Sequence, residues 1–195
     1  MIMDKSNKIN GKILAVDIAE IALFIVLMVV GTYIQIPFPL VPLTFQTVIS
    51  VLAGLMLGSK KGMISMSVYC FMGLVGLPVF TAGGGIAYVL KPSFGYIIGF
   101  IASAGVGGAI AGRANLPLWR YIVGALCAFL ADYIIGIPYC MVAAKLLHVE
   151  NLTNLLIFGN LVYMPKDAVL SVLAAFLAKA VLPVVRKRRV KIQLH

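Results

Sequence analysis

Charged residues are scarce in this chain, and acidic residues are the scarcest of them. Only 11% of the 195 residues are Asp, Glu, Lys or Arg, and six of these are acidic. Soluble domains carry about 25% charged residues. Hydrophobic residues instead make up 62% of the chain, and the mean hydropathy is +1.07. The composition therefore predicts an integral membrane protein with one domain over residues 1–195 and little mass left for a soluble domain.

Residues that hold metals or perform catalysis are also few. The three cysteines, Cys70, Cys127 and Cys140, lie apart in apolar runs without a CxxC pair, and the two histidines are too scattered for a metal site. No GxxxxGK[ST], HExxH or GxSxG motif occurs in the sequence. We therefore expect no enzyme, no resident metal and no cofactor. Energy for any active transport must come from a partner or from an ion gradient.

Six apolar segments are candidates for membrane-spanning helices. A span needs about 20 residues, and fewer where neighbouring helices shield it. The second and third segments are short, and the half-apolar stretch ENLTNLLIFGNLVY over 150–163 is a candidate helix at the outer surface. The predicted spans are Ile13–Ile36, Leu43–Gly58, Gly62–Leu77, Phe94–Gly112, Pro117–Leu147 and Met164–Val185.

Basic residues are distributed unequally between the predicted connections. With the N-terminus in the cytoplasm, 13 of the 16 basic residues fall on the cytoplasmic side, and only Lys91, Lys145 and Lys166 fall on the other side. The positive-inside rule therefore predicts a multi-pass protein with both termini in the cytoplasm. The basic tail RKRRVK over 186–191 lies beside a span, which favours contact with anionic lipid over nucleic acid.

The connection GLPVFTAGGGIAYVLKPSFGY over 76–96 joins the third and fourth spans and faces outward in this topology. Because glycine has no Cβ, its backbone can approach a ligand closely and present its own N–H groups. The flanking aromatic residues would supply apolar walls with polar tips, or alternatively an interfacial belt. We expect a small-molecule pocket here, with contributions from Gly83, Gly84, Gly85, Tyr88 and Tyr96.

Several polar residues are further candidates for this pocket. Lys166 and Asp167 open the sixth span and place a cation beside an anion; the alternatives are a snorkelling lysine and a helix-capping acid. Gln46 lies near the first turn of the second span and can both donate and accept hydrogen bonds. Asp132 lies in the middle of the fifth span, where an acid is either functional or bonded to a neighbouring helix.

Small residues form a stripe on the first span. Ala15, Ala19 and Ala22 recur at i, i+4 and i+7, near the predicted cytoplasmic end. Such a stripe either packs within the bundle or serves as a docking face for another protein. Spacing alone favours internal packing.

These motifs together resemble one transporter family. The sequence is similar to the biotin-specific S component (BioY family) of energy-coupling factor transporters. The resemblance covers most of the chain, and the order and spacing of the matching motifs are specific. The matching motifs are PLTFQ at 42–46, AGLMLG at 53–58, GLVGLPVF at 73–80, the glycine run, PSFGY at 92–96 and MPKDAVLSVLAA at 164–175.

The resemblance implies a fold, a ligand and partners. It implies an all-α protein of the prokaryotic plasma membrane with six transmembrane helices and both termini cytoplasmic, which binds biotin from outside. S components dock a transmembrane T component through small residues on their first helix. The resemblance therefore implies that Ala15, Ala19 and Ala22 form the surface on which the T component docks. The T component joins two ATPase subunits, so ATP is used only by partners.

Two positions depart from the family pattern. The glycine run lacks the Asn that family members often carry, and the position of a family lysine on the last helix is Leu170. Lys166 lies four residues earlier, on the same helix face, so we predict that it supplies the cation. Two alternatives to biotin uptake are an S component for another vitamin and a membrane scaffold without ligand transport.

Overall fold

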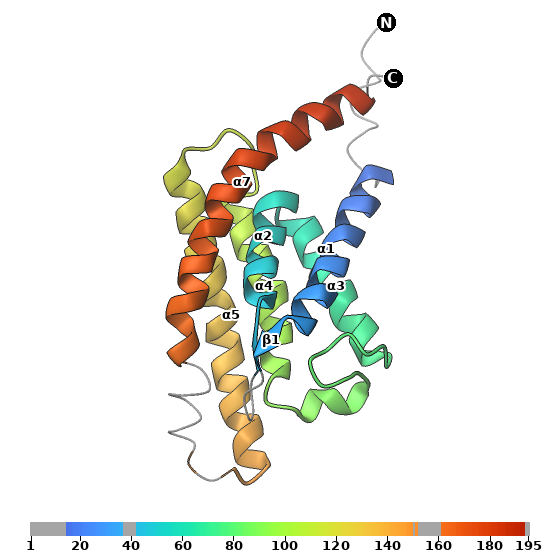
Figure 1. The fold of residues 1–195 in the computed structure, drawn as a ribbon, viewed down its shortest axis with the longest axis vertical. Helices are drawn as coiled ribbons and strands as arrows, with labels where there is room; N and C mark the ends of the chain where they lie inside the picture. Colours follow the sequence, from blue (N-terminus) through green and yellow to red (C-terminus); the bar gives the residue numbers. More distant parts are fainter. Residues whose placement is uncertain (1–14, 37–41, 150, 152–160, 194–195) are drawn as a thin grey trace, which may run out of the picture.

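Helices dominate the computed structural model, which describes residues 15–36, 42–149, 151 and 161–193. The helices run roughly along the longest axis of the molecule (Figure 1). Short 3-10 helices, η1 over Ile86–Leu90 and η2 over Leu161–Tyr163, lie in the connections. The α-helices of the described residues are α1 Ala15–Tyr33, α2 Gln46–Leu57, α3 Ser59–Leu74, α4 Phe94–Ala111, α5 Leu118–Leu146 and α7 Met164–Gln193.

Four of the described helices are long and apolar enough to cross a membrane: α1, α4, α5 and the stretch Leu161–Arg186 of η2 and α7. The helix α2 has 12 residues and α3 has 16, which correspond to about 18 and 24 Å at 1.5 Å per residue. The fold is therefore a helical membrane bundle, as expected. The shorter helix α2 lies in the interior, because it contacts α4, α7 and α5, whereas α3 exposes apolar side chains such as Phe71 at the surface.

The two ends of the bundle differ in charge. The helix α1 begins and α7 ends at one end, which we call the basic end, whereas β1 and η1 lie at the opposite end, the loop end (Figure 1). The basic end carries Lys60, Lys61, Arg113, Arg120 and Arg186 among the described side chains, and the loop end carries Lys91, Lys145 and Lys166.

The all-α class holds, but four residues at the ends of the first two predicted spans are not helical. Gln35–Ile36 and Leu43–Thr44 form two short strands, β1 and β2, which pair antiparallel with Gln35 opposite Thr44. The first and second predicted spans were therefore too long at this connection. Hydropathy cannot separate a short apolar strand from the end of an apolar helix, because both are apolar runs. The intervening residues 37–41 lie outside the described structure, as do 150 and 152–160 of the expected surface helix.

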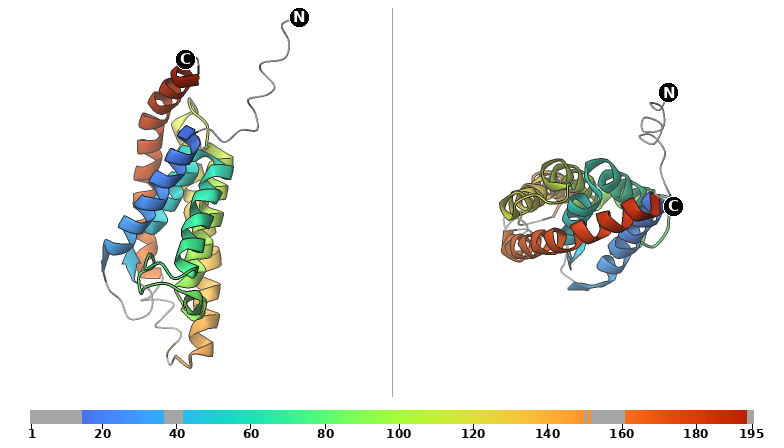
Figure 2. Two further views of the ribbon diagram at one scale, coloured as in Figure 1. Left: turned by 90° about the vertical axis from the view of Figure 1, so that its right-hand side faces the viewer. Right: turned by 90° about the horizontal axis from the view of Figure 1, so that it is seen from above.

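Most of the remaining helix boundaries in the described residues lie within one residue of the prediction, and α3 and α7 are the exceptions. The helix α3 begins at Ser59, three residues before the predicted start at Gly62. The helix α3 ends at Leu74, three residues before the predicted end, where the glycine-containing loop begins. The helix α7 continues to Gln193, past the predicted end at Val185, and contains Pro183. Its C-terminal part bends and extends across the basic end toward α1, as Figures 1 and 2 show. An internal proline removes a backbone hydrogen bond and accounts for such a bend.

Small residues bring α4 close to its neighbours. A Cβ added to Gly54 on α2 would lie 2.9 Å from the Cα of Ala104 on α4. On the α5 side, a Cβ added to Gly107 would lie 3.0 Å from the Cβ of Ala128. Membrane helices associate through this kind of close backbone approach, because lipid provides no hydrophobic driving force between them. The small residues of α4 therefore pack inside the bundle.

We predict opposite effects for two Gly→Ala substitutions inside these helices. Gly54→Ala should lower the thermal unfolding temperature by about 4–8 °C, because the new methyl collides with backbone and overpacking costs about 2 kcal/mol. Gly105→Ala is the matched control, since its Cβ would meet only the flexible side chain of Met63. Alanine is the better helix former, so the control should be neutral or stabilising. Equal melting temperatures in detergent for the two variants would contradict this account of α2–α4 packing.

Candidate ligand-binding site

A cavity opens at the loop end, between α2, α4, α5, α7 and the loop that follows α3. The space within it, with the open mouth included, is about 570 Å³. Phenylalanine, isoleucine and several tyrosine side chains form most of the wall. The polar side chains that join them are Thr44, Gln46, Thr47, Thr81, Ser93, Lys166 and Asp167.

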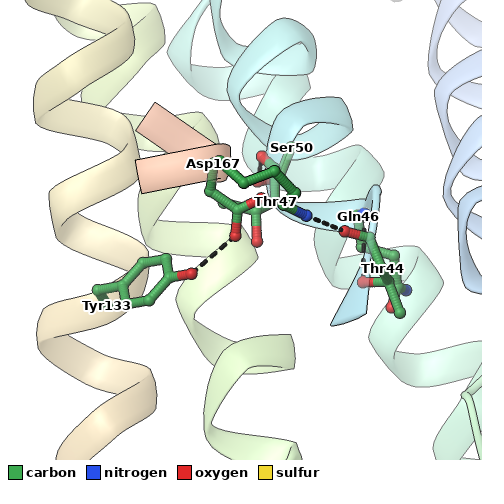
Figure 3. A network of polar contacts seen from close by, with 7 residues as sticks. Thr44, Gln46, Thr47, Ser50, Tyr133 and Asp167 are labelled. Carbon is green, nitrogen blue, oxygen red and sulfur yellow. Dashed lines mark hydrogen bonds and ion pairs between the residues drawn. The ribbon is translucent and has the colours of Figure 1, made fainter. Parts of the chain in front are cut away.

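An ion pair at the start of α7 forms one side of this cavity. The Nζ of Lys166 lies 2.7 Å from Oδ1 of Asp167, and their side chains are 29% and 6% exposed. Lys166 also donates a hydrogen bond of 3.0 Å to the backbone carbonyl of Thr44 in β2. Tyr133 on α5 donates to Oδ2 of Asp167 at 2.7 Å (Figure 3). Lys166 is therefore held against the cavity wall rather than extended toward the lipid.

Gln46 is the first residue of α2 and lies on another side of the cavity. Its Nε2 donates to the hydroxyl of Tyr69 on α3 at 2.6 Å. Tyr69 in turn donates to the carbonyl of Val79 at 2.9 Å and lies 3.1 Å from the hydroxyl of Thr32 on α1. This network joins three elements at the cavity wall.

The glycine run shapes the loop beside the cavity. Gly83 and Gly85 have φ values of +101° and +105°, which favour glycine. Their N–H groups donate to the carbonyls of Phe80 and Gly73, at 3.1 and 2.7 Å. A Cβ on Gly84 would lie 2.9 Å from the carbonyl oxygen of Gly73. None of the three glycines is among the residues that line the cavity. The predicted contact of these glycines with a ligand remains a prediction. In the structure, they allow the loop to fold tightly.

The two predicted tyrosines do line the cavity. Tyr88 in η1 is buried, and its hydroxyl lies 2.8 Å from that of Thr81 and 3.2 Å from that of Ser93. Tyr96 on α4 packs its ring 5.6 Å from the ring of Tyr133, measured between centroids. Both tyrosines therefore form part of the cavity wall rather than a belt at the membrane–water interface.

Asp132 is not among the residues of the cavity wall. It is fully buried where α4 and α5 meet, and a Cβ on Gly99 would collide with its carboxylate. The neighbouring Tyr133, which sequence reasoning missed, lines the cavity instead. Successive helix residues are turned by about 100°, so only one of the two can face the cavity. Tyr69 was missed as well. A tyrosine deep in an apolar span was the available signal, because its hydroxyl needs a partner when buried.

The alanine stripe on α1 lies on the surface. Ala15, Ala19 and Ala22 are exposed in this chain. The internal packing favoured by their spacing alone is therefore wrong. Asp17, between them, turns inward and pairs with Lys61 on α3, with 2.6 Å between the charged atoms.

Metal ligands do not cluster in the structure. Among the described residues, no group of three His, Cys, Asp or Glu side chains could hold a metal ion.

Comparison with known proteins gives consistent results. A family model described as the BioY family matches residues 3–187. The chain is 40% identical over 176 residues to the probable biotin transporter BioY of Lysinibacillus sphaericus, covering 89% of this chain and 90% of that protein. It is 34% identical over 178 residues to the putative biotin transporter BioYB of Bacillus subtilis, covering 87% and 89% of the two chains.

One solved structure has a similar fold. It is the S-component for biotin from an ECF-type ABC transporter, with a TM-score of 0.69 at 24% sequence identity. The match covers 90% of this chain and 92% of the other. At this identity, the likeness supports the S-component fold.

We predict that the ion pair stabilises the loop end. Lys166→Met leaves the buried Asp167 carboxylate without its cation, so the free energy of unfolding should fall by about 2 kcal/mol, less than for a fully buried pair because Lys166 is partly exposed. Thermal unfolding in detergent measures this. Lys91→Met, at an exposed lysine of the same end, is the control and should change little. The double variant Lys166→Met/Asp167→Leu should recover most of the loss, and failure to recover any would contradict the pairing.

Proposed function

The chain belongs to the BioY family, and we propose that it captures biotin for uptake, as the substrate-binding membrane subunit of an energy-coupling factor transporter. The observation that carries this proposal is the cavity with a cation and an anion in contact on one side and aromatic walls around them. Biotin needs such a site, because its fused rings and valeryl chain are apolar while its ureido group is strongly polar.

The contact between Lys166 and Asp167 favours one orientation of the ligand. In a ureido group, the N–H donors flank the carbonyl acceptor, so this group can meet the carboxylate and the ammonium together while they remain 2.7 Å apart. Binding the valeryl carboxylate would instead draw Lys166 away and leave Asp167 buried without a cation, which is costly. We therefore assign the ureido end to this pair, with Asp167 accepting an N–H and Lys166 donating to the carbonyl.

The topology of the proposal rests on the charge of the two ends. The basic end carries most of the described basic side chains, and α1 begins and α7 ends there. By the positive-inside rule, this end faces the cytoplasm. The loop end with its cavity then faces outward in the prokaryotic plasma membrane, with six crossings, and α2 is shielded by its longer neighbours.

The partners follow from the surface of α1. The exposed stripe of Ala15, Ala19 and Ala22 lets another helix approach closely. We propose that a transmembrane T component docks there and brings two ATPase subunits. ATP is then used only by these partners, and the chain itself takes no cofactor.

Ligand identity is tested with the purified wild-type chain. Biotin should raise its thermal unfolding temperature, because a ligand that binds only the folded state stabilises it. Thiamine and riboflavin should not. Stabilisation by one of these vitamins and not by biotin would replace the proposal with an S component for that vitamin. No response to any of the three would favour a membrane scaffold.

The orientation of biotin is tested with Lys166→Ala and a pair of ligands. If Lys166 meets the ureido carbonyl, the variant should lose affinity for biotin and for biotin methyl ester by the same factor, about tenfold for one charged hydrogen bond. Isothermal titration of both ligands against wild type, Lys166→Ala and the control Lys91→Ala measures it. A loss confined to biotin would instead place Lys166 at the valeryl carboxylate.

Docking on α1 is tested by separating uptake from binding. Ala19→Trp should reduce biotin uptake by cells more than tenfold and leave biotin affinity of the purified protein unchanged, because the bulky ring blocks the approach of a partner helix. Ile134→Trp on α5 is the control, at a position that is 70% exposed and away from α1. Loss of both uptake and binding in Ala19→Trp, or no loss of uptake, would contradict the docking role.

A further inference from the structure

Tyr69 has three polar partners but only one hydroxyl proton. The residue is fully buried on α3 and belongs to the cavity wall. Its oxygen lies 2.6 Å from Nε2 of Gln46, 2.9 Å from the carbonyl oxygen of Val79 and 3.1 Å from the hydroxyl of Thr32. The acceptor of this proton determines whether Gln46 turns its NH₂ group or its carbonyl oxygen toward the cavity.

The carbonyl of Val79 takes the proton. A carbonyl can only accept, and Tyr69 is the one donor to this oxygen among the hydrogen bonds of the described residues. If the proton turned elsewhere, the carbonyl of a buried residue would be left without a donor, at a cost comparable to a lost hydrogen bond. Thr32 is the weaker of the two acceptors: its own proton goes to the carbonyl of Met28 at 2.9 Å, so it already has a hydrogen bond, and it lies farther from Tyr69, at 3.1 Å, than the carbonyl of Val79 does.

The orientation of the Gln46 amide follows from this. Since Tyr69 has given its proton to Val79, its oxygen can only accept a hydrogen bond from Gln46. Gln46 must therefore turn its NH₂ group toward Tyr69, which agrees with the observed contact of Nε2. The carbonyl oxygen of the same amide, on its other branch, is the acceptor left for a ligand in the cavity that Gln46 lines.

We propose that Tyr69 is a positioning residue that fixes Gln46 as a hydrogen-bond acceptor for the second ureido N–H of biotin. The inference rests on the proposed function. Asp167 accepts one N–H, Lys166 donates to the carbonyl between them, and the Gln46 oxygen accepts the other N–H. The backbone carbonyl of Thr44, two residues before Gln46, already holds Lys166 on this side of the site at 3.0 Å. Biotin is thereby distinguished from ligands that lack two flanking donors.

The first test removes only the hydroxyl. Tyr69→Phe should weaken biotin binding about tenfold, as expected for an acceptor that is no longer oriented. Tyr121→Phe is the matched control. Tyr121 is also fully buried and also bonds a backbone carbonyl, that of Arg113 at 2.6 Å, but at the basic end. The control should bind biotin like wild type. Unchanged affinity in Tyr69→Phe, or an equal loss in both variants, would overturn the inference.

The second test asks whether Tyr69 acts through Gln46. In a double-mutant cycle measured by isothermal titration, Gln46→Leu/Tyr69→Phe should bind biotin no more weakly than Gln46→Leu alone. Losses that multiply would show that Tyr69 supports the loop or the fold independently of Gln46, and would overturn the positioning role. The wild-type titration separates the two proposals, because a wild-type chain that does not bind biotin defeats the proposed function itself.

Discussion

A carboxylate buried inside a helical bundle needs a cation or hydrogen-bond donors in contact with it. The loop end of this protein is built around one such carboxylate. Asp167 is held by the Lys166 ammonium and by the Tyr133 hydroxyl. These contacts tie the start of α7 to α5, and the bond from Lys166 to the carbonyl of Thr44 ties it to β2. The ion pair thus fixes three elements around one cavity. It also decides which ligands fit, because a guest that separated the pair would have to replace the interaction that it breaks.

The cavity lies at the end of the bundle, beyond the region where the helices pack most closely. Along its length, α4 lies against α2 and α5 with glycine and alanine at the contacts, so that no space remains between the backbones. At the loop end, aromatic side chains replace the small ones, and the tightly folded glycine loop closes over them. The basic end has the opposite character, with charged side chains and, on α1, an exposed stripe of alanines. The cavity and the alanine stripe are therefore separated along the bundle.

The sequence predicted the helices and the charged pair of the cavity well, because hydropathy and charge report them directly. Gln46, Lys166, Tyr88 and Tyr96 all line the cavity as expected. The sequence was less informative about which face of a helix turns toward the cavity. Asp132 and Tyr133 are neighbours in the chain, but only the tyrosine faces the cavity. The direction of the alanine stripe depends on contacts with distant segments, which local patterns do not encode.

The central claim is that biotin enters the loop-end cavity from outside the cell. Cysteine protection tests it most directly. In a variant without the native cysteines, Ser93→Cys places a thiol on the cavity wall and Ile86→Cys places one on the exposed face of η1. In intact cells, a membrane-impermeant thiol reagent should label both, and biotin should protect only Ser93→Cys. Labelling of Ser93→Cys that biotin does not slow, or that occurs only from the cytoplasmic side, would contradict the account.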